Sequence, residues 1–414
     1  MDNIILKNCY VNGSIEVPSS KSVAHRALVA AAFSDKPIKI KKIDFSKDIY
    51  ATIDALRQLG VTISIEDKYI LVDGSTIIKD GDVSINANES GSTLRFMIPI
   101  TTMLEKTTIF DGVGRLPERP LDDYFEIFDK NGVEYSCPEG KYLPLKVSGS
   151  IKFNEVYVKG NTSSQFISGL IFCGLVSPVK VNITTDLQSK PYVDITVDVL
   201  KKFGCDIKEC DNIYEISKNP TQIDKYSVER DWSQAAFFMC AAAINGCVTL
   251  KGMNMESVQG DMEIISLLKK FGADVTINGS DLTIKKSVLK GIDVDVRDIP
   301  DLVPVLAVLA CFAEGKTKIY NAERLRIKES DRLQAMYEEL TKLGADVEIG
   351  ADYLIINGGK KLHGAHVDSH NDHRIAMAMA VASVGCVGEI SLCGFDAVSK
   401  SYPHFFEDWS SLNE

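Results

Sequence analysis

The sequence predicts an α/β fold built from six repeated units, and three observations lead to this prediction. An amphipathic helix pattern that ends in glycine recurs five times along the chain. Two short β-like runs around a turn follow each of these glycines. A second helix pattern, made of small and apolar residues behind a polar tip, recurs six times at nearly the same interval. A fixed interval is typical of chains assembled from one supersecondary unit.

The glycine-ended helices set the interval of the repeat. Their glycines are separated by 72, 72, 68 and 72 residues and are Gly60, Gly132, Gly204, Gly272 and Gly344. Glycine readily adopts the left-handed conformation that ends a helix, and Lys or Arg in the last turn complements the helix dipole. The segment 331–340 shows the amphipathic pattern, and 345–349 and 353–356 show the β-like runs. Each glycine is therefore expected to end a surface helix and lead into a hairpin.

The six polar tips each precede a run that is apolar on every side. They are Lys21–Arg26, Glu89–Arg95, Ser163–Gln165, Asp231–Ser233, Pro300–Asp301 and Asp372–Arg374. A helix without a polar face must be buried within its domain. The sequence therefore predicts six buried helices with polar N-termini.

Six tips and five glycine-ended helices leave one unit incomplete. The segment 399–409 near the end of the chain has the pattern of a sixth amphipathic helix without following strands. The N-terminal runs 4–6 and 14–17 have a β-like pattern and are expected to supply these strands. The simplest arrangement is six units closed head to tail, with the first strands belonging to the last unit.

Composition indicates a soluble globular protein. The 45% of hydrophobic residues excludes general disorder, and the net charge of −11 argues against a general nucleic-acid or anionic-membrane binder. The run from Met1 to Lys7 lacks the features of a signal peptide, and no apolar run is long enough to span a bilayer. Ten scattered cysteines without a CxxC pair indicate reduced thiols in a cytoplasmic protein. No dinucleotide- or nucleotide-binding glycine motif is present, so no cofactor is expected.

The starts of the buried helices predict an anion-binding site. A helix N-terminus presents unpaired N–H groups and about half a positive charge. Lys21, Arg26, Arg95 and Arg374 add full positive charges at the same phase of the repeat. The alternative is that the tips are plain N-caps and the cations are surface charges. The recurrence of four cations at one phase favours the anion site.

The starts of the second helices carry further candidates. They are Arg115–Pro120, Ser189–Tyr192, Lys328–Arg332 and Ser399–Lys400. In the third, Glu329 lies between Lys328 and Arg332, which suits a general acid next to a bound phosphate. The same spacing is also compatible with a solvated helix face.

Four histidines, His363, His366, His370 and His373, follow one another closely. Metal ligation needs ligands that converge at a fixed geometry. Gly364 and Val367 place a loop or strand between the first histidine and the helix start at Asp372, and no Cys or Glu completes a known motif. We expect no metal site here, but solvated loop histidines and one site residue, His373. A metal-binding or anion-binding scaffold without catalysis is the alternative.

Eight short motifs, spread over essentially the whole chain, resemble the 5-enolpyruvylshikimate-3-phosphate (EPSP) synthase family in their order. They are Pro18–Ser22 with Arg26, Asp111–Gly112 with Arg115 and Glu118–Pro120, Ser163–Gln165, Ser189–Tyr192, Ile299–Asp301, Arg326–Arg332, Asp372–Met377 and Lys400. A sister family, which transfers enolpyruvyl to UDP-N-acetylglucosamine, shares the architecture. It usually carries a reactive cysteine in the loop corresponding to 111–120, where this sequence has none. The resemblance therefore favours EPSP synthase.

The resemblance implies two domains, each of three βαβαββ units, with buried helices inside and sheets outside. Residues 18–228 would form one domain, residues 1–17 and 229–414 the other, with the active site in the cleft between them. The implied reaction transfers the enolpyruvyl group of phosphoenolpyruvate to the 5-hydroxyl of shikimate 3-phosphate and releases phosphate. It proceeds by addition and elimination through a tetrahedral intermediate. The family works in the shikimate pathway towards chorismate and aromatic amino acids, and glyphosate inhibits it. A monomer without a cofactor is expected.

The resemblance also assigns roles to residues. Shikimate 3-phosphate would contact Ser22, Arg26, Ser163, Ser164, Gln165, Ser189, Tyr192 and Lys328. Phosphoenolpyruvate would contact Lys21, Gly91, Arg115, Gln165, Arg332, Arg374 and Lys400. Asp301 would be the base towards the attacking hydroxyl and Glu329 the proton donor, with Lys21 and His373 assisting. Two positions depart from the family pattern: Glu89 replaces an Asn in the segment before Arg95, and Arg324 stands where some members have Asn.

Overall fold

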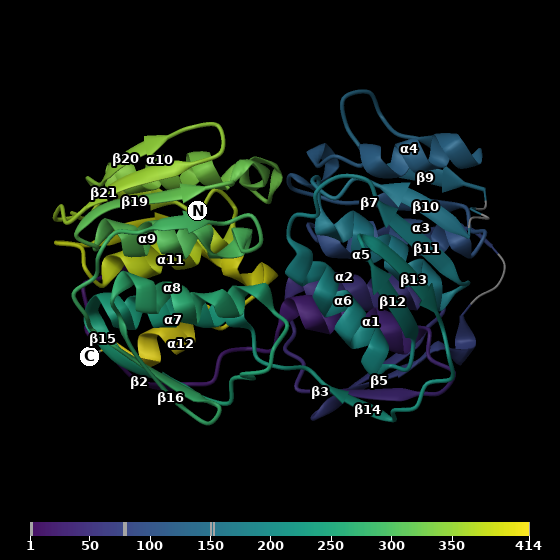
Figure 1. The fold of residues 1–414 in the computed structure, drawn as a ribbon, viewed down its shortest axis with the longest axis horizontal. Helices are drawn as coiled ribbons and strands as arrows, with labels where there is room; N and C mark the ends of the chain where they lie inside the picture. The colour runs from purple at the N-terminus through teal and green to yellow at the C-terminus, as the bar shows by residue number, and fades with distance from the viewer. Residues whose placement is uncertain (1–2, 78–80, 150, 152–153, 414) are drawn as a thin grey trace. The chain divides into compact units, whose positions relative to one another are not determined.

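The chain forms two compact units in the computed structural model, which describes residues 3–77, 81–149, 151 and 154–413 (Figure 1). One unit, called here the continuous unit, is Ser19–Glu229. The other, called the split unit, combines Met1–Pro18 with Arg230–Glu414. Met1 and Asp2, the start of the run in which no signal peptide is expected, lie outside the described residues, as does Glu414.

Strands of the continuous unit form three four-stranded sheets among the described residues. In hydrogen-bonded order they are β14 (Lys225–Ser227), β3 (Ile38–Lys41), β5 (Tyr69–Asp73) and β4 (Thr62–Glu66); β6 (Val83–Asn86), β7 (Thr108–Asp111), β9 (Leu145–Ser148) and β8 (Glu134–Ser136); and β10 (Glu155–Val158), β11 (Val179–Ile183), β13 (Ile213–Ser217) and β12 (Asp206–Cys210). In each sheet the first two strands are parallel and the other neighbours antiparallel.

Helices of the continuous unit alternate between a buried and an amphipathic kind. The buried ones are α1 (Lys21–Ala32), α3 (Gly91–Met103) and α5 (Ser164–Phe172). The amphipathic ones are α2 (Lys47–Gln58), α4 (Asp122–Asn131) and α6 (Lys190–Lys202), and short 3₁₀ turns lie at η1 (Gly74–Thr76), η2 (Leu116–Glu118) and η3 (Cys173–Leu175). One hydrophobic cluster joins these helices to the inner faces of the sheets.

The split unit repeats this plan. Its sheets are β2 (Val11–Ile15), β15 (Gly246–Leu250), β17 (Asp281–Lys285) and β16 (Asp274–Asn278); β18 (Asp293–Asp295), β19 (Gly315–Tyr320), β21 (Leu354–Gly358) and β20 (Asp346–Ile349); and β22 (His366–Asp368), β23 (Ile390–Cys393) and β1 (Asn3–Leu6). Its helices are α7 (Trp232–Asn245), α9 (Val303–Cys311) and α11 (His373–Ser383), which are buried, and α8 (Ile264–Phe271), α10 (Arg332–Lys342) and α12 (Phe405–Ser411). Its 3₁₀ turns are η4 (Gly260–Glu263), η5 (Pro300–Leu302), η6 (Glu323–Ile327) and η7 (Phe395–Lys400).

The buried helices of the split unit pack directly on one another. Figure 1 shows α7, α9 and α11 next to one another, and each of them contacts the other two. Every residue of α9 and of α11 is buried, as their apolar composition predicts. The polar N-termini of these helices are therefore held in fixed positions by a close-packed core.

The predicted repeat is confirmed. All five predicted capping glycines have positive φ values, between 65° and 99°. They lie one or two residues after the ends of α2, α4, α6, α8 and α10. The six buried helices begin at or within three residues of the predicted tips. None of the described helices could cross a membrane.

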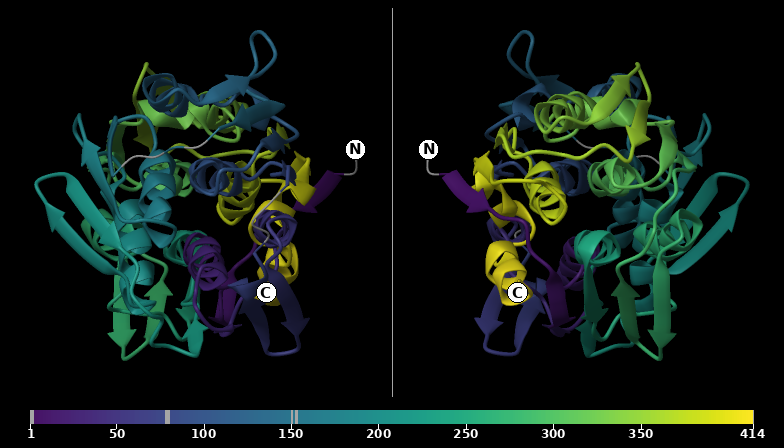
Figure 2. Two further views of the ribbon diagram at one scale, coloured as in Figure 1. Left: turned by 90° about the vertical axis from the view of Figure 1, so that its right-hand side faces the viewer. Right: turned by 90° about the vertical axis from the view of Figure 1, so that its left-hand side faces the viewer.

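The head-to-tail closure is only half correct. The run 4–6 pairs with the last unit as predicted, because β1 lies antiparallel to β23; Figure 2 shows the purple N-terminal strand beside the yellow C-terminal segment. The second run does not, since β2 ends at Ile15 and pairs in parallel with β15. The place beside β15 is open to β2 because β14, which directly precedes α7 in the chain, pairs with β3 instead. β2, which precedes α1, therefore pairs with the strand after α7, and β14, which precedes α7, pairs with the strand after α1.

The predicted sixth amphipathic helix, 399–409, is also interrupted. The 3₁₀ turn η7 ends at Lys400, and α12 begins only at Phe405. Pro403 lies between them. Proline lacks a backbone N–H, so it cannot continue the hydrogen-bond ladder of a helix, which explains the interruption.

Candidate active site

The continuous unit carries its candidate cations at the N-termini of buried helices. Ser20 caps α1, and Lys21 follows with its Nζ 2.7 Å from Asp48 Oδ2. Arg95 Nη1 donates to Gln165 Oε1 at 3.1 Å, and Gln165 Nε2 donates to Ser92 Oγ at 3.0 Å. The N-termini of α3 and α5 are therefore joined through Gln165, the residue that the family resemblance places at both substrates.

Gly91, the first residue of α3, lies against two guanidinium groups. A Cβ at this position would be 2.6 Å from Arg119 Nη1 and 2.9 Å from Arg95 Nη1. Both arginines are buried. Two buried cations next to the free N–H groups of a helix start form a strong site for an anion.

Arg26 is engaged with protein acceptors through all three nitrogens. Nε donates to Thr196 Oγ1 at 2.7 Å, Nη1 to the Ser22 carbonyl at 2.7 Å and Nη2 to the Tyr192 carbonyl at 2.8 Å. Its exposed fraction is 2%. Arg26 therefore holds the first turn of α6, where Ser189 has a left-handed φ of 54°, against the start of α1. Its predicted contact with substrate stays a prediction.

The remaining predicted residues of this unit lie at helix starts. Ser163 caps α5 by accepting a hydrogen bond from the Gln165 N–H at 3.3 Å, and Ser164 is the first residue of the helix. Arg115 directly precedes η2 and is partly exposed. Glu89, which departs from the family pattern, has its carboxylate packed against Gly114. It therefore points to the loop that carries Arg115.

Asp301 is the centre of the charged cluster in the split unit. It lies in η5, at the entrance to α9. Its Oδ1 accepts from Arg332 Nη1 at 2.9 Å and its Oδ2 from Arg374 Nη2 at 2.8 Å. Lys328 Nζ lies 3.9 Å from Oδ1. One carboxylate is thus surrounded by three cations.

Arg332 joins this carboxylate to two others. Its Nη2 donates to Glu329 Oε2 at 2.8 Å and its Nε to Asp372 Oδ2 at 2.8 Å. Arg332 is 1% exposed, and Asp372 is fully buried. Asp372 also caps α11 by accepting from the Arg374 N–H at 2.9 Å. The starts of α9, α10 and α11 therefore share one buried ion-pair network.

The network keeps its aspartates ionised. Burial by itself raises the pKa of Asp301, but Arg374, Lys328 and Arg332 outweigh it and hold the pKa well below its usual range. The pKa of Asp372 is likewise lowered, because Arg332 and His373 outweigh its burial. Burial lowers the pKa of Lys328 to about 8, although Asp301 and Glu329 oppose this. Lys328 is therefore the cation of this cluster that loses its charge most readily.

His373 and Lys400 lie beside the same network. His373 is the first residue of α11 and is 2% exposed. Lys400 is 4% exposed, and its Nζ donates to the Asn371 carbonyl at 2.5 Å. The other histidines are separate: His363 and His366 are exposed on the surface, as expected, whereas His370 is partly buried against Glu339. Arg324 donates to the Arg297 carbonyl at 2.8 Å.

Sequence reasoning missed two residues near these clusters. Arg119 was noticed only as part of a motif, and its position against Gly91 depends on the fold of the loop 111–121. Asp261 in η4 accepts a hydrogen bond from Ser233 and is 3% exposed. Burial and the neighbouring Asp301 raise the pKa of Asp261 to about 7, against the pull of Arg374. Asp261 stands three residues before α8, as Glu329 stands three residues before α10, and this shared position could have identified it.

Comparison with known proteins decides the family. A family model described as EPSP synthase (3-phosphoshikimate 1-carboxyvinyltransferase) matches residues 6–409. The chain belongs to this family. The family, the α/β fold class and the enzyme class predicted from the eight motifs are thereby confirmed.

Relatives from this EPSP synthase family match along nearly all of their length. The 3-phosphoshikimate 1-carboxyvinyltransferase of Clostridium acetobutylicum is 45% identical, with 100% of this chain and 97% of the relative covered. That of Clostridioides difficile is 43% identical, with 97% and 95% covered. The structure of EPSP synthase from Acinetobacter baumannii has a TM-score of 0.82 and 27% identity, covering 99% of this chain and 98% of that one. The enolpyruvyl transferase NikO from Streptomyces tendae has the same fold, with a TM-score of 0.76 and 14% identity over 99% of this chain and 97% of its own.

Proposed function

We propose that this chain transfers the enolpyruvyl group of phosphoenolpyruvate to the 5-hydroxyl of shikimate 3-phosphate, with release of phosphate. This is the reaction of the shikimate pathway that leads towards chorismate and the aromatic amino acids. The observation that carries the proposal is the ionised Asp301 between Arg332 and Arg374, at a buried helix start, in a chain of this family.

Both substrates are phosphorylated carboxylic acids that repel each other. Holding them together requires a high density of positive charge and preorganised N–H donors. Each unit supplies one such set: the starts of α1, α3 and α5 with Lys21, and the network around Arg332. We propose that one reaction uses both sets, with the substrate contacts distributed as the motifs predict.

Asp301 accepts the proton in this proposal. A carboxylate that stays ionised can accept a proton but has none to donate, which supports the base role for Asp301 and leaves the donor role to Glu329. The hydroxyl oxygen bonds to C2 of phosphoenolpyruvate while its proton passes to Asp301, and C3 gains a proton from Glu329. The tetrahedral intermediate then returns a proton from C3 to the Glu329 carboxylate, and the C2–O bond breaks with its electron pair leaving on the phosphate. Lys21 and His373 assist these proton transfers.

Substrate binding makes Asp301 a better base. Its low pKa in the free protein reflects the three cations around it. Anionic groups of the substrates that bind to Arg374, Lys328 or Arg332 weaken the attraction of these cations for the aspartate. The pKa of Asp301 then moves up towards its ordinary value, and proton abstraction becomes easier once both ligands are bound.

The test of this activity is phosphate release with two alternative acceptors. Phosphoenolpyruvate and shikimate 3-phosphate together are expected to release phosphate, while phosphoenolpyruvate with UDP-N-acetylglucosamine releases none. Release with the nucleotide sugar would assign the chain to the sister reaction. If the protein binds both acids but releases no phosphate, it is a non-catalytic anion-binding scaffold.

We also propose that the protein works as a monomer in the cytoplasm. All ten cysteines are free thiols, and Cys173, Cys240 and Cys311 are buried in the cores. Free buried thiols are typical of proteins in a reducing compartment. Sedimentation at micromolar concentration tests the monomer, which a mass of twice 45.5 kDa would contradict.

Gly91→Ala is expected to raise KM for phosphoenolpyruvate by about tenfold, because its Cβ displaces the guanidinium ends of Arg119 and Arg95 and so weakens their attraction for a bound anion. The inhibition constant of glyphosate rises in parallel. Steady-state kinetics measure both. Gly132→Ala is the control, since it strains the left-handed cap of α4 but has no neighbour within 4 Å. The control lowers Tm and leaves KM unchanged; equal KM values in the two variants would contradict the placement of the anion site at Gly91.

The KM for shikimate 3-phosphate is expected to rise as the pH passes about 8. Lys328, whose pKa is lowered to about 8, is protonated below this pH and loses its charge above it, so an anionic ligand is bound less tightly at alkaline pH. Lys328→Arg should abolish this rise, because arginine stays protonated throughout the range. A rise of the same size in the variant would show that a different group causes it.

A further inference from the structure

The turn before α11 is held in a strained backbone conformation. His370 and Asn371 both have a φ of 52°, which places two successive non-glycine residues in the left-handed region. Such residues cost free energy and persist only where the surroundings hold them. Part of the support is local, because the His370 N–H donates to Asp368 Oδ1 at 2.7 Å and the Asp372 N–H to the Ser369 carbonyl at 2.9 Å.

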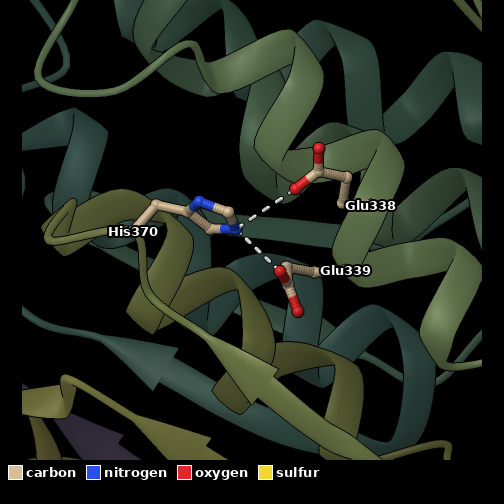
Figure 3. A group of neighbouring side chains, drawn as sticks. All are labelled: Glu338, Glu339 and His370. Carbon is tan, nitrogen blue, oxygen red and sulfur yellow. Dashed lines mark hydrogen bonds and ion pairs between the residues drawn. The ribbon is translucent and has the colours of Figure 1, made fainter.

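The rest of the support comes from a buried carboxylate on α10. Glu339 is fully buried, and its Oε1 lies 2.7 Å from His370 Nε2. Figure 3 shows the Nε2 end of the imidazole directed at both carboxylates, with Glu338 at 3.9 Å from Nε2. Glu339 Oε2 accepts from the Asp368 N–H at 3.1 Å. One carboxylate thus fixes both the backbone before the turn and the side chain within it.

The hydrogen bond between His370 and Glu339 holds this turn, and a neighbouring lysine makes Glu338, Glu339 and His370 a poor site for a divalent cation. Lys342 Nζ lies 2.8 and 2.9 Å from the two oxygens of Glu339. An ammonium group in contact with both oxygens repels a divalent cation from the same carboxylate. The side chain of Glu338 is further occupied by Gln334, whose Nε2 donates to it at 2.7 Å.

The other side of the turn contacts residues of the candidate active site. The Asn371 carbonyl accepts from Lys400 Nζ, and Asp372 accepts from Arg332 and from the Arg374 N–H. These three cations are the proposed contacts of phosphoenolpyruvate in the split unit. Their placement therefore depends on the turn.

We infer that protonated His370, held by the buried Glu339, is a positioning residue that fixes this turn and thereby the three cations that bind phosphoenolpyruvate. The inference rests on the proposed function of Lys400, Arg332 and Arg374. His370 touches no substrate and acts through the backbone of Asn371 and Asp372. Loss of its hydrogen bond to Glu339 lets the strained turn relax.

The charges around His370 give the positioning a pH dependence. Glu339 and Glu338 of α10 and Asp368 of β22 face the ring, and Lys342 faces Glu339 from the same helix. The hydrogen bond to Glu339 raises the pKa of His370, with burial acting against it. His370 is therefore charged below this raised pKa and loses its proton as the pH climbs through it. The KM for phosphoenolpyruvate is expected to increase over that interval.

The experiment compares His370→Ala, His370→Gln and a control over a range of pH. His370→Ala is expected to raise KM for phosphoenolpyruvate by about tenfold, which corresponds to the loss of one hydrogen bond to a charged group. The kcat and the KM for shikimate 3-phosphate should stay nearly unchanged. His370→Gln retains a donor for Glu339, so it restores most of the affinity but removes the pH dependence attributed to the imidazolium. His366→Ala, which changes an exposed histidine of β22, is expected to match the wild type.

Three results would overturn the inference. One is a wild-type KM for phosphoenolpyruvate in His370→Ala. Another is a loss of affinity for both substrates alike that His370→Gln does not repair, which indicates a purely structural role. The third is a wild-type KM that changes when EDTA is added, since this would make the three side chains metal ligands. Failure of the proposed function is distinct, because the wild type itself would then release no phosphate.

Discussion

Asp301→Asn is expected to lower kcat by about 10²–10⁴-fold, the range for loss of a positioned general base. Asparagine has nearly the same shape and keeps an acceptor oxygen towards one of the two arginines, Arg332 or Arg374, while its NH₂ group faces the other. It cannot take the hydroxyl proton. The variant also removes a negative charge from among three cations. Binding of the anionic substrates is therefore expected to be retained or tightened while turnover is lost. Phosphate release at saturating substrate and titration calorimetry measure the two effects separately.

Asp293→Asn is the matched control for this variant. Asp293 is exposed at the start of β18, in the same unit, and its replacement is expected to leave kcat unchanged. A kcat for Asp301→Asn within a few fold of the control would contradict the base role. The pH profiles of the wild type give a second check. The acid limb of kcat reports the pKa of Asp301 in the substrate complex, and the acid limb of kcat/KM reports it in the free enzyme. The first limb should lie at higher pH than the second.

Arg332→Met is expected to lower the free energy of unfolding by about 3–5 kcal/mol, as found when one partner of a buried ion pair is removed. Arg332 is 1% exposed and contacts Asp301, Glu329 and Asp372. Without it, the fully buried Asp372 loses its closest counter-charge and three carboxylates repel one another. Urea unfolding followed by circular dichroism measures the loss.

The difference in the free energy of unfolding between wild type and Arg332→Met should become smaller as the pH falls. In the wild type the lowered pKa values of Asp301 and Asp372 contribute stability that is present above the unfolded-state pKa and lost on acidification. In the variant, protonation of the same carboxylates relieves repulsion, so the two proteins converge in acid. Arg297→Met, at a partly exposed ion pair with Asp295, is the control and is expected to cost less than about 1 kcal/mol. Equal losses in the two variants would contradict the buried network.

Periodic features could be predicted from the sequence because local chemistry determines them. Gly132 and Gly272 end their helices in the left-handed conformation that few other residues adopt at so little cost. The buried helices could be recognised because α9 and α11 have no polar face. Asp301, Glu329 and Arg374 could be singled out because they stand at predicted helix starts, whereas their roles come from the resemblance to the family.

Features that depend on long-range pairing could not be predicted. β2 and β14 are short strands of five and three residues, and nothing local to them specifies which of the sheets each one joins. The contacts of Arg26 with Thr196 and Tyr192 join residues about 170 positions apart. The sequence predicts a solvated loop histidine at His370, since its partner Glu339 lies on another element, 31 residues earlier, and no local pattern joins the two.

The most direct test of the account is the reaction run in D₂O with phosphoenolpyruvate and shikimate 3-phosphate. Addition followed by elimination turns C3 into a methyl group for a time, so the vinyl group of the product is expected to contain deuterium, as seen by NMR. Asp301→Asn should form this labelled product only at its greatly reduced rate. Phosphate release by the wild type with no deuterium in the vinyl group would contradict addition–elimination at this site.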